Sequence, residues 1–226
     1  MNEILPTNPK TDTAHNAWDE LWGSDEGRAR WLMAEETVIA AAKQAFDKGA
    51  RTAVDIGCGV GRHALGLAEM GYTVSATDMS NVGLEQVRAF AREKRLEIDA
   101  KVGSMTELPY ADETFDFAVS FNVFSHGDKG IVRCAIEEAR RVLKPGGILY
   151  ATLLSLRSTA PCKGREVASQ TFVWDDGDED HKHPHFFSDT KTLNELFVGF
   201  EWLRVGDYHN TALSDYWHWH VVVERK

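Results

Sequence analysis

The chain has 226 residues and a formal net charge of −10, since 35 Asp and Glu outnumber 25 Lys and Arg. This length favours one domain with an elaboration, and a hydrophobic fraction of 43% excludes a largely disordered chain. The negative charge argues against a nucleic acid or an anionic membrane as the main partner, and the 3 cysteines, with no C-x-x-C motif, favour a reducing cytoplasm.

The N-terminal segment, residues 1–29, is expected to form a helical lid that precedes the main domain at residues 30–226. Trp18, Leu21 and Trp22 have helical spacing, and the residues GSDEG that follow interrupt the pattern. Apolar positions then recur through residues 30–48 as in an amphipathic helix that ends at a glycine.

Five apolar runs alternate with helical patterns along the next hundred residues. The strands are expected at residues 52–57, 72–78, 98–103, 115–124 and 148–154, with helices between them at 62–70, 81–94 and 129–143. This alternation predicts an α/β fold with a doubly wound, mostly parallel sheet and helices on both faces. In such sheets, ligands bind at the carboxyl ends of the strands.

The pattern changes after the fifth strand. Residues 155–187 are expected to be an irregular loop insertion, and a loop of this length often covers a binding site. A helix is expected at residues 190–197, followed by strands at 201–208 and 216–224 that an antiparallel pairing would suit.

A glycine-rich turn carries the strongest functional signal. The residues VDIGCGVGR (54–62) join a strand to a helix, where glycines let a ligand approach the backbone and the helix N-terminus offers unpaired N–H groups. Asp78 ends the next strand, 21 positions after Gly57, where a carboxylate can bind the hydroxyls of a ribose. Together these features indicate a nucleoside cofactor.

The spacing of the glycines distinguishes between two classes of cofactor. A dinucleotide fingerprint reads G-x-G-x-x-G, whereas here Arg62 stands in place of the third glycine. Asp55 directly precedes the turn, where its charge would repel a pyrophosphate but attract a cationic amino-acid group. A nicotinamide-dependent oxidoreductase is therefore the alternative rather than the preferred interpretation.

The turn resembles motif I of the class I methyltransferases, which use S-adenosylmethionine, and the resemblance covers roughly residues 30–154. Further matches are Asp78, the loop Gly103-Ser104-Met105, the strand end Phe121-Asn122-Val123 and the turn at residues 143–147. Many members carry an acid where Ser104 stands, so a hydroxyl or backbone group is expected to replace that contact. The resemblance implies a seven-stranded Rossmann-like sheet whose last strand is antiparallel.

The resemblance also implies a function, which is methyl transfer from S-adenosylmethionine to a small molecule. A weaker likeness of WDELW (18–22) and of residues 185–201 is to small-molecule members of the type 11 and tellurite-resistance kinds. A non-catalytic S-adenosylmethionine-binding module is a second alternative, and the protein is expected to be a monomer or homodimer. The residues implied to bind the cofactor are Asp55, Gly57, Cys58, Gly59, Gly61, Asp78, Met79, Ser104, Met105 and Asn122.

The candidates for the acceptor side are histidines and tryptophans outside these motifs. His126 follows the fourth strand, and His185 lies between Pro184 and two phenylalanines, so both are candidate catalytic residues, although a packing role for His185 is the alternative. Trp18, Trp22 and His183 are candidate substrate or lid residues. No metal site is expected, because the histidines near residue 183 have no cysteine or supporting pattern beside them.

Overall fold

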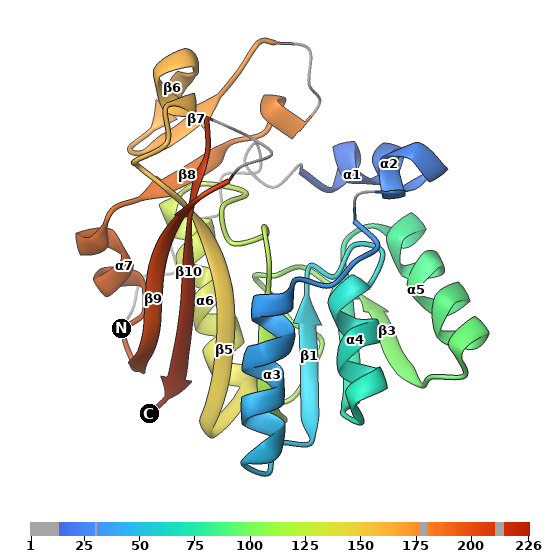
Figure 1. The fold of residues 1–226 in the computed structure, drawn as a ribbon. Coiled ribbons are helices and arrows are strands. Elements are labelled where there is room, and N and C mark those ends of the chain that lie inside the picture. Colours follow the sequence, from blue (N-terminus) through green and yellow to red (C-terminus); the bar gives the residue numbers. More distant parts are fainter. Residues whose placement is uncertain (1–13, 30, 177–179, 211–214) are drawn as a thin grey trace.

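The computed structural model describes residues 14–29, 31–176, 180–210 and 215–226 (Figure 1). The helices are α1 (Ala14–Trp22), α2 (Asp25–Ala29), α3 (Glu36–Asp47), α4 (Arg62–Met70), α5 (Asn81–Lys94), α6 (Lys129–Val142) and α7 (Thr190–Leu196), with short 3-10 helices η1 (Ala160–Lys163) and η2 (Asp180–Lys182). The strands are β1 (Thr52–Ile56), β2 (Thr73–Asp78), β3 (Ile98–Val102), β4 (Phe115–Ser120), β5 (Leu143–Ser155), β6 (Arg165–Ala168), β7 (Thr171–Val173), β8 (His185–Ser188), β9 (Phe200–His209) and β10 (Trp217–Arg225).

The central sheet has the order β3-β2-β1-β4-β5-β10-β9 in the part of the chain that the structure describes. The first five of these strands are parallel, while β10 runs antiparallel to both β5 and β9. The predicted doubly wound sheet with an antiparallel last strand is therefore confirmed. The order reverses at β1 and β4, so a ligand site is expected above this pair.

Helices cover both faces of the sheet, as the alternating pattern predicts (Figure 1). One core joins α3, α4 and α5 to alternate residues of β1, β2 and β4, and the other joins α6 and α7 to the opposite face. Because side chains alternate along a strand, Val54 and Ile56 pack towards α6 while Ala53 packs towards α3 and α4. Asp55 consequently faces the α4 side.

The segment at residues 155–187 is more ordered than the expected irregular loop. β6 and β7 form an antiparallel hairpin, β7 pairs with β8, and β8 joins the end of β5 in parallel. These strands are only three or four residues long, so their sequences have too few alternating apolar and polar positions to predict a strand. The expectation of an irregular segment is wrong for these residues, which extend the sheet above β5 (Figure 1).

The helices α1 and α2 lie over the carboxyl ends of the parallel strands (Figure 1). The helical spacing of Trp18 and Trp22 is confirmed by α1, but α2 begins at Asp25, inside the residues expected to interrupt the helix. Residues 1–13 of the predicted lid segment lie outside the described residues. Among the described residues, no helix has the length and apolar character needed to cross a membrane.

Candidate functional site

A cavity lies above the carboxyl ends of β1, β2 and β4. It holds about 900 Å³ of empty space, part of it open to solvent. Its lining residues are Trp18, Trp22, Trp31, Gly57, Cys58, Gly59, Val60, Arg62, His63, Asp78, Met79, Gly103, Ser104, Met105, Phe121, Asn122, Val123 and His126.

The glycine turn forms the floor of the cavity because its backbone needs residues without a side chain. Gly57 has φ +69°, in the left-handed region, and an added Cβ would lie 2.4 Å from Val123 Cγ2. Gly59 has φ +53°, and its Cβ would lie 2.9 Å from the Trp22 ring. The turn therefore packs against the loop after β4 on one side and α1 on the other.

Asp78 stands at the end of β2, next to the glycine turn. Its carboxylate accepts hydrogen bonds from the Gly59 N–H at 2.7 Å and from the Ser80 N–H at 2.8 Å. Burial raises the pKa of Asp78, although these two backbone hydrogen bonds lower it in part. Since each carboxylate oxygen can accept a second hydrogen bond, the group remains available to ligand hydroxyls in the cavity.

Asp55 lies beneath the turn rather than in the cavity lining. The side chain is 2% exposed, and its Oδ2 accepts a hydrogen bond from the Ala64 N–H at 3.0 Å. It thereby supplies the N-terminus of α4 with the side-chain acceptor that its N-cap, Gly61, cannot provide. Burial is the largest effect on Asp55 and raises its pKa to about 7. The hydrogen bond from Ala64 and the charge of Arg62 lower this pKa, but by less than burial raises it.

The ends of β3 and β4 form the opposite walls of the cavity. Asn122 has φ +60°, which is uncommon for a residue other than glycine, and its N–H donates to Thr152 Oγ1 at 2.7 Å. Ser104 Oγ lies 2.8 Å from Thr106 Oγ1 and also accepts a hydrogen bond from the Thr106 N–H. Asn122 and Ser104 are thus held by neighbouring side chains where the resemblance to the methyltransferases places them.

Three tryptophans cover the glycine turn, two of them from α1 and the third from the segment between α2 and α3. Trp18 stacks on Trp22 with ring centroids 5.1 Å apart, and Trp31 meets both rings edge to face. Asp19 of the same helix hydrogen-bonds Ser80 and thereby ties α1 to the start of α5. The cavity consequently has an aromatic cover that is fixed to the strand end bearing Asp78.

Two further polar residues line the cavity that the sequence analysis did not assign to the site. Arg62 pairs with Glu35 at 3.2 Å and lies 5.1 Å from the ring centroids of both Trp31 and Phe121. His63 accepts a hydrogen bond from the Glu35 N–H, and burial followed by the charge of Arg62 lowers its pKa to about 3. Arg62 could have been found from its position in the turn, whereas no local pattern distinguishes His63.

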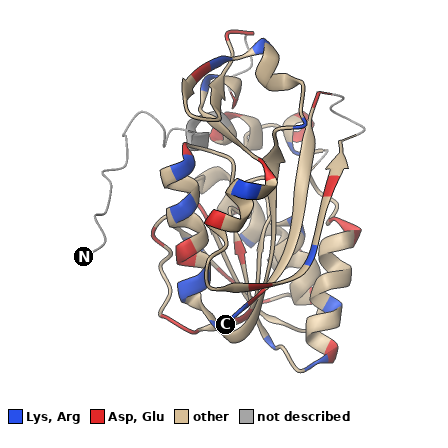
Figure 2. Ribbon diagram, turned by 90° about the vertical axis from the view of Figure 1, so that its left-hand side faces the viewer, with Lys and Arg blue, Asp and Glu red and all other residues tan. Residues whose placement is uncertain are grey.

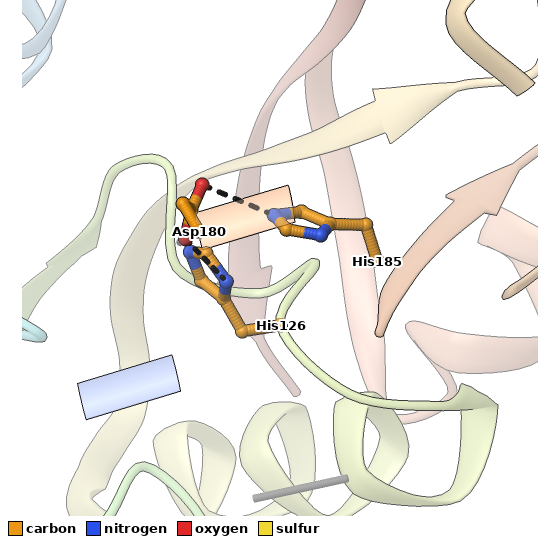
Figure 3. Close-up of side chains that lie close together, drawn as sticks. All are labelled: His126, Asp180 and His185. Carbon is orange, nitrogen blue, oxygen red and sulfur yellow. Dashed lines mark ion pairs between the residues drawn. The ribbon is translucent and has the colours of Figure 1, made fainter. Parts of the chain in front are cut away.

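The two candidate catalytic histidines meet at the edge of the cavity (Figure 3). His126 and His185 are paired across an antiparallel bridge, and their ring centroids lie 4.9 Å apart. Asp180 lies beside both rings, with Oδ2 3.3 Å from His185 Nε2 and Oδ1 3.9 Å from His126 Nδ1. We call these three residues the histidine cluster.

Electrostatics within the histidine cluster follow from its burial. Burial lowers the pKa of His126 to about 4, the charge of Asp180 raises it in part, and His185 lowers it further. Burial by itself would raise the pKa of Asp180, but the neighbouring His185 and His126 hold that pKa below its usual value. His126 is thus a neutral ring at neutral pH.

The structure brings most of the sequence-predicted site residues into one cavity. The residues that line it are Gly57, Cys58, Gly59, Asp78, Met79, Ser104, Met105, Asn122, Trp18, Trp22 and His126. Asp55, Gly61, His183 and His185 lie outside the lining. Of these, His185 contacts the cavity only through His126, and His183 contributes its backbone carbonyl to His185 Nδ1 at 2.9 Å.

The cavity suits a nucleoside that carries an amino-acid group. Gly57 and Gly59 bring backbone without side chains to its floor, and Asp78 offers acceptors for ribose hydroxyls. Met79, Met105 and Phe121 supply apolar surface of the kind that a purine ring contacts. The donor set therefore fits S-adenosylmethionine.

Comparison with known families and sequences agrees with this geometry. Residues 53–147 match the family model described as a methyltransferase domain. A probable chloroplastic tocopherol O-methyltransferase of Oryza sativa subsp. japonica is 29% identical over 171 residues, which are 66% of this chain and 46% of the relative. A ubiquinone biosynthesis O-methyltransferase of Alkalilimnicola ehrlichii is 32% identical over 46% of this chain and 42% of the relative. The chain thus spans less than half the length of these two relatives.

Solved structures extend the similarity of fold over nearly the whole chain. The 1,6-didemethyltoxoflavin-N1-methyltransferase of Burkholderia thailandensis, solved with S-adenosylhomocysteine, has a TM-score of 0.70 at 16% identity and covers 98% of this chain and 92% of its own. The [4+2]-cyclase SpnF also has a TM-score of 0.70, at 19% identity, with 98% of both chains covered. The methyltransferase-domain match at residues 53–147 and the O-methyltransferase relatives agree with the glycine turn, and the solved structures share the fold of the chain. Together these findings support a class I S-adenosylmethionine-dependent methyltransferase domain in this chain.

Proposed function

We propose that the protein transfers the methyl group of S-adenosylmethionine to a small-molecule acceptor. The observation that carries this proposal is one cavity in which a nucleoside floor, made by the glycine turn and Asp78, adjoins an aromatic and histidine wall. When bound, the cofactor supplies an electrophilic methyl group on its sulfonium. The protein then has mainly to align the acceptor, and alignment alone can lower the barrier by up to about 7–11 kcal/mol.

We assign the cofactor side of the cavity to residues that belong to the parallel strand ends. The backbone of Gly57 and Gly59 and the carboxylate of Asp78 would hold the nucleoside, with Met79, Ser104, Met105 and Asn122 around it. Asp55 would act from beneath by fixing α4.

We assign the acceptor side to α1 and the loop after β4. Trp18, Trp22 and Trp31 present apolar ring surface, which favours a flat or apolar acceptor and excludes water from the reacting groups. His126 is the histidine of the cluster that lines the cavity, so it is placed to orient the acceptor or to take its proton. His185 and Asp180 would be positioning residues behind it.

A small acceptor fits the distribution of charge better than a nucleic acid does. Lys and Arg are interspersed with Asp and Glu along the ribbon rather than gathered on one side (Figure 2), and the net charge is −10. Cys58, Cys134 and Cys162 are free thiols, which supports the proposal of a cytoplasmic location.

Binding of the cofactor is the first expected result. S-adenosylhomocysteine at 100 times its dissociation constant should stabilise the folded protein by about 2.7 kcal/mol, because it binds only the folded state. Isothermal titration calorimetry gives the dissociation constant, and thermal unfolding with and without ligand gives the stabilisation. A panel of phenols, amines and thiols, tested with S-adenosylmethionine for product by mass spectrometry, would then identify the acceptor.

The rival cofactor provides the control for this experiment. NAD and NADP, titrated in the same way, should not bind. Binding of either of them without binding of S-adenosylmethionine or its product would favour an oxidoreductase. Binding of S-adenosylmethionine without turnover on any acceptor class would favour a non-catalytic binding module.

Replacing Asp78 should weaken cofactor binding. Asp78→Ala removes charge-assisted hydrogen bonding to the ribose, a loss of about 1.5–3 kcal/mol in all, so the dissociation constant should rise by about 10-fold to 150-fold. Calorimetry on Asp78→Asn, which keeps one carbonyl acceptor, should give an intermediate value. Because the Gly59 N–H also loses its partner, thermal unfolding without ligand controls for damage to the turn. Equal affinity in Asp78→Ala and wild type would remove Asp78 from the cofactor site.

A further inference from the structure

We propose that the histidine cluster (His126, Asp180 and His185) binds a divalent transition-metal ion. Its two imidazole nitrogens and carboxylate come from three segments that are distant in sequence, and the ligand atoms all lie within 4.8 Å of one another. Figure 3 shows both rings turned towards the carboxylate.

The tautomer of His185 is the first argument for a cation. His185 Nδ1 lies 2.9 Å from the His183 carbonyl oxygen, which can only accept, so Nδ1 carries the hydrogen. In the neutral ring, Nε2 then presents a lone pair, and that lone pair faces Asp180 Oδ2 at 3.3 Å. Two electron-rich atoms face each other across this distance, and a positive species between them would make the contact favourable.

The distances favour a metal ion over a proton. A charge-assisted N–H···O bond is usually about 2.7–2.9 Å long, shorter than the 3.3 Å found here. Two ligands bound at about 2.1 Å to one tetrahedral ion are about 3.4 Å apart, which matches. His126 Nδ1 lies 3.9 Å from Asp180 Oδ1 and has no hydrogen-bond partner among the described residues.

The backbone holds the two histidines in place. The bridge between His126 and His185 puts their side chains on one face, because directly opposed residues of an antiparallel pair project the same way. Hydrogen bonds flank the bridge on both sides, from the Phe186 N–H to the Ser125 carbonyl and from the Gly127 N–H to the Pro184 carbonyl, each 2.8 Å long. The carbonyl bonded to His185 Nδ1 is also the usual partner of a metal-binding histidine.

The ligand set specifies the class of metal. Two imidazoles and one carboxylate suit Zn²⁺, Fe²⁺ or Co²⁺, whereas Mg²⁺ and Ca²⁺ prefer oxygen ligands alone. Three protein ligands leave at least one coordination position open, as in catalytic zinc sites. Since His126 also lines the cavity, the ion would lie behind the acceptor wall and would fix the orientation of the His126 ring in it. This last step rests on the proposed function, but metal binding itself does not.

The test titrates the chelator-treated full-length protein with Zn²⁺ and Co²⁺, with Mg²⁺ as the hard-cation control. We expect one Zn²⁺ per chain, visible absorption bands for bound Co²⁺ that Zn²⁺ displaces, and no binding of Mg²⁺. Loss of an outer partner of a metal ligand usually costs 10-fold to 100-fold in affinity, so Asp180→Asn and His185→Gln should each weaken binding by about 100-fold or more.

Two matched variants from the same segment serve as controls. Asp176→Asn and His181→Gln alter a neighbouring pair, joined at 2.7 Å, that lies outside the histidine cluster, and both should bind Zn²⁺ as wild type does. Circular dichroism and S-adenosylhomocysteine titration show whether each variant is folded. Absence of stoichiometric binding by wild type, or binding that survives in the folded Asp180→Asn and His185→Gln variants, would overturn the proposal. A protein that binds S-adenosylhomocysteine but no metal would leave the proposed function intact.

Discussion

His126→Gln should lower the turnover number by about 10²-fold to 10⁴-fold while leaving the affinity for S-adenosylhomocysteine nearly unchanged. His126 lines the acceptor side of the cavity, on the loop after β4, and its ring is 13% exposed. Glutamine keeps polarity and approximate size, but it neither takes up a proton as imidazole does nor replaces an imidazole ligand. Initial rates with an acceptor from the panel, and calorimetry with the product cofactor, measure the two quantities.

Two further histidine variants make this result specific. His209→Gln changes an exposed ring on β9 next to Trp217, outside the cavity lining, and should have wild-type kinetics. His185→Gln should have a smaller effect than His126→Gln, because His185 is buried behind His126 and acts through it. An effect mainly on the Michaelis constant of the acceptor would assign His126 to orientation alone. Wild-type kinetics for His126→Gln would remove it from the site.

Asp55→Asn should stabilise the cofactor-free protein above pH 7. Burial raises the pKa of Asp55 to about 7 in the folded protein, whereas it is about 3.9 in an unfolded chain. Between these values the folded state binds more protons than the unfolded state, so the free energy of unfolding falls as the pH rises from about 4 to 7. At about 1.4 kcal/mol per pKa unit, the free energy of unfolding falls by on the order of 4 kcal/mol over this pH range.

The amide of the variant does not ionise, and its Oδ1 can still accept the hydrogen bond from the Ala64 N–H. Urea denaturation at intervals from pH 4 to 9 should therefore show a decline in stability for wild type that Asp55→Asn lacks. Parallel curves for the two proteins would contradict the raised pKa of Asp55.

Asp116→Asn provides a control, because its expected effect on stability at neutral pH is opposite to that of Asp55→Asn. Asp116 on β4 is half-buried, and although burial itself would raise its pKa, hydrogen bonds from Lys144 and from the Arg51 and Thr52 N–H groups hold the pKa below its usual value. Asp116 therefore stabilises the folded state above its unfolded pKa of about 3.9 and loses this contribution in acid. Asp116→Asn should lower stability at neutral pH, where Asp55→Asn raises it.

The fold class and the nucleoside floor could be predicted from the sequence because their signals are local. Alternating apolar runs and helical patterns specify a parallel sheet, and a parallel sheet places its strand ends at one edge. Gly57 and Gly59 lie in the turn after β1 and Asp78 ends β2, so their convergence in one cavity follows from the order of the elements. The antiparallel β10 followed from the family resemblance and not from a local pattern.

The roles of Asp55 and His185 depended on the tertiary structure. The glycine turn predicted that the Asp55 carboxylate lies near the ligand. Because side chains alternate along β1, Asp55 instead faces α4, where its carboxylate accepts a hydrogen bond from the Ala64 N–H at the start of the helix. His185 was grouped with its sequence neighbours, whereas its partners are His126 after β4 and Asp180 in η2. Residue spacing along the chain carries no information about such pairs.

The sequence by itself determined the sheet, the glycine turn and the acid at the end of β2, since each depends on periodicity or spacing within a few residues. Only the tertiary structure decided which side chains meet at the cavity and behind it, because α1, the loop after β4 and the segment leading into β8 are distant in sequence. The bridge between His126 and His185 closes a loop of nearly sixty residues, and it forms because β8 packs on the end of β5. Contacts of this kind are set by the packing of distant elements and not by local preference.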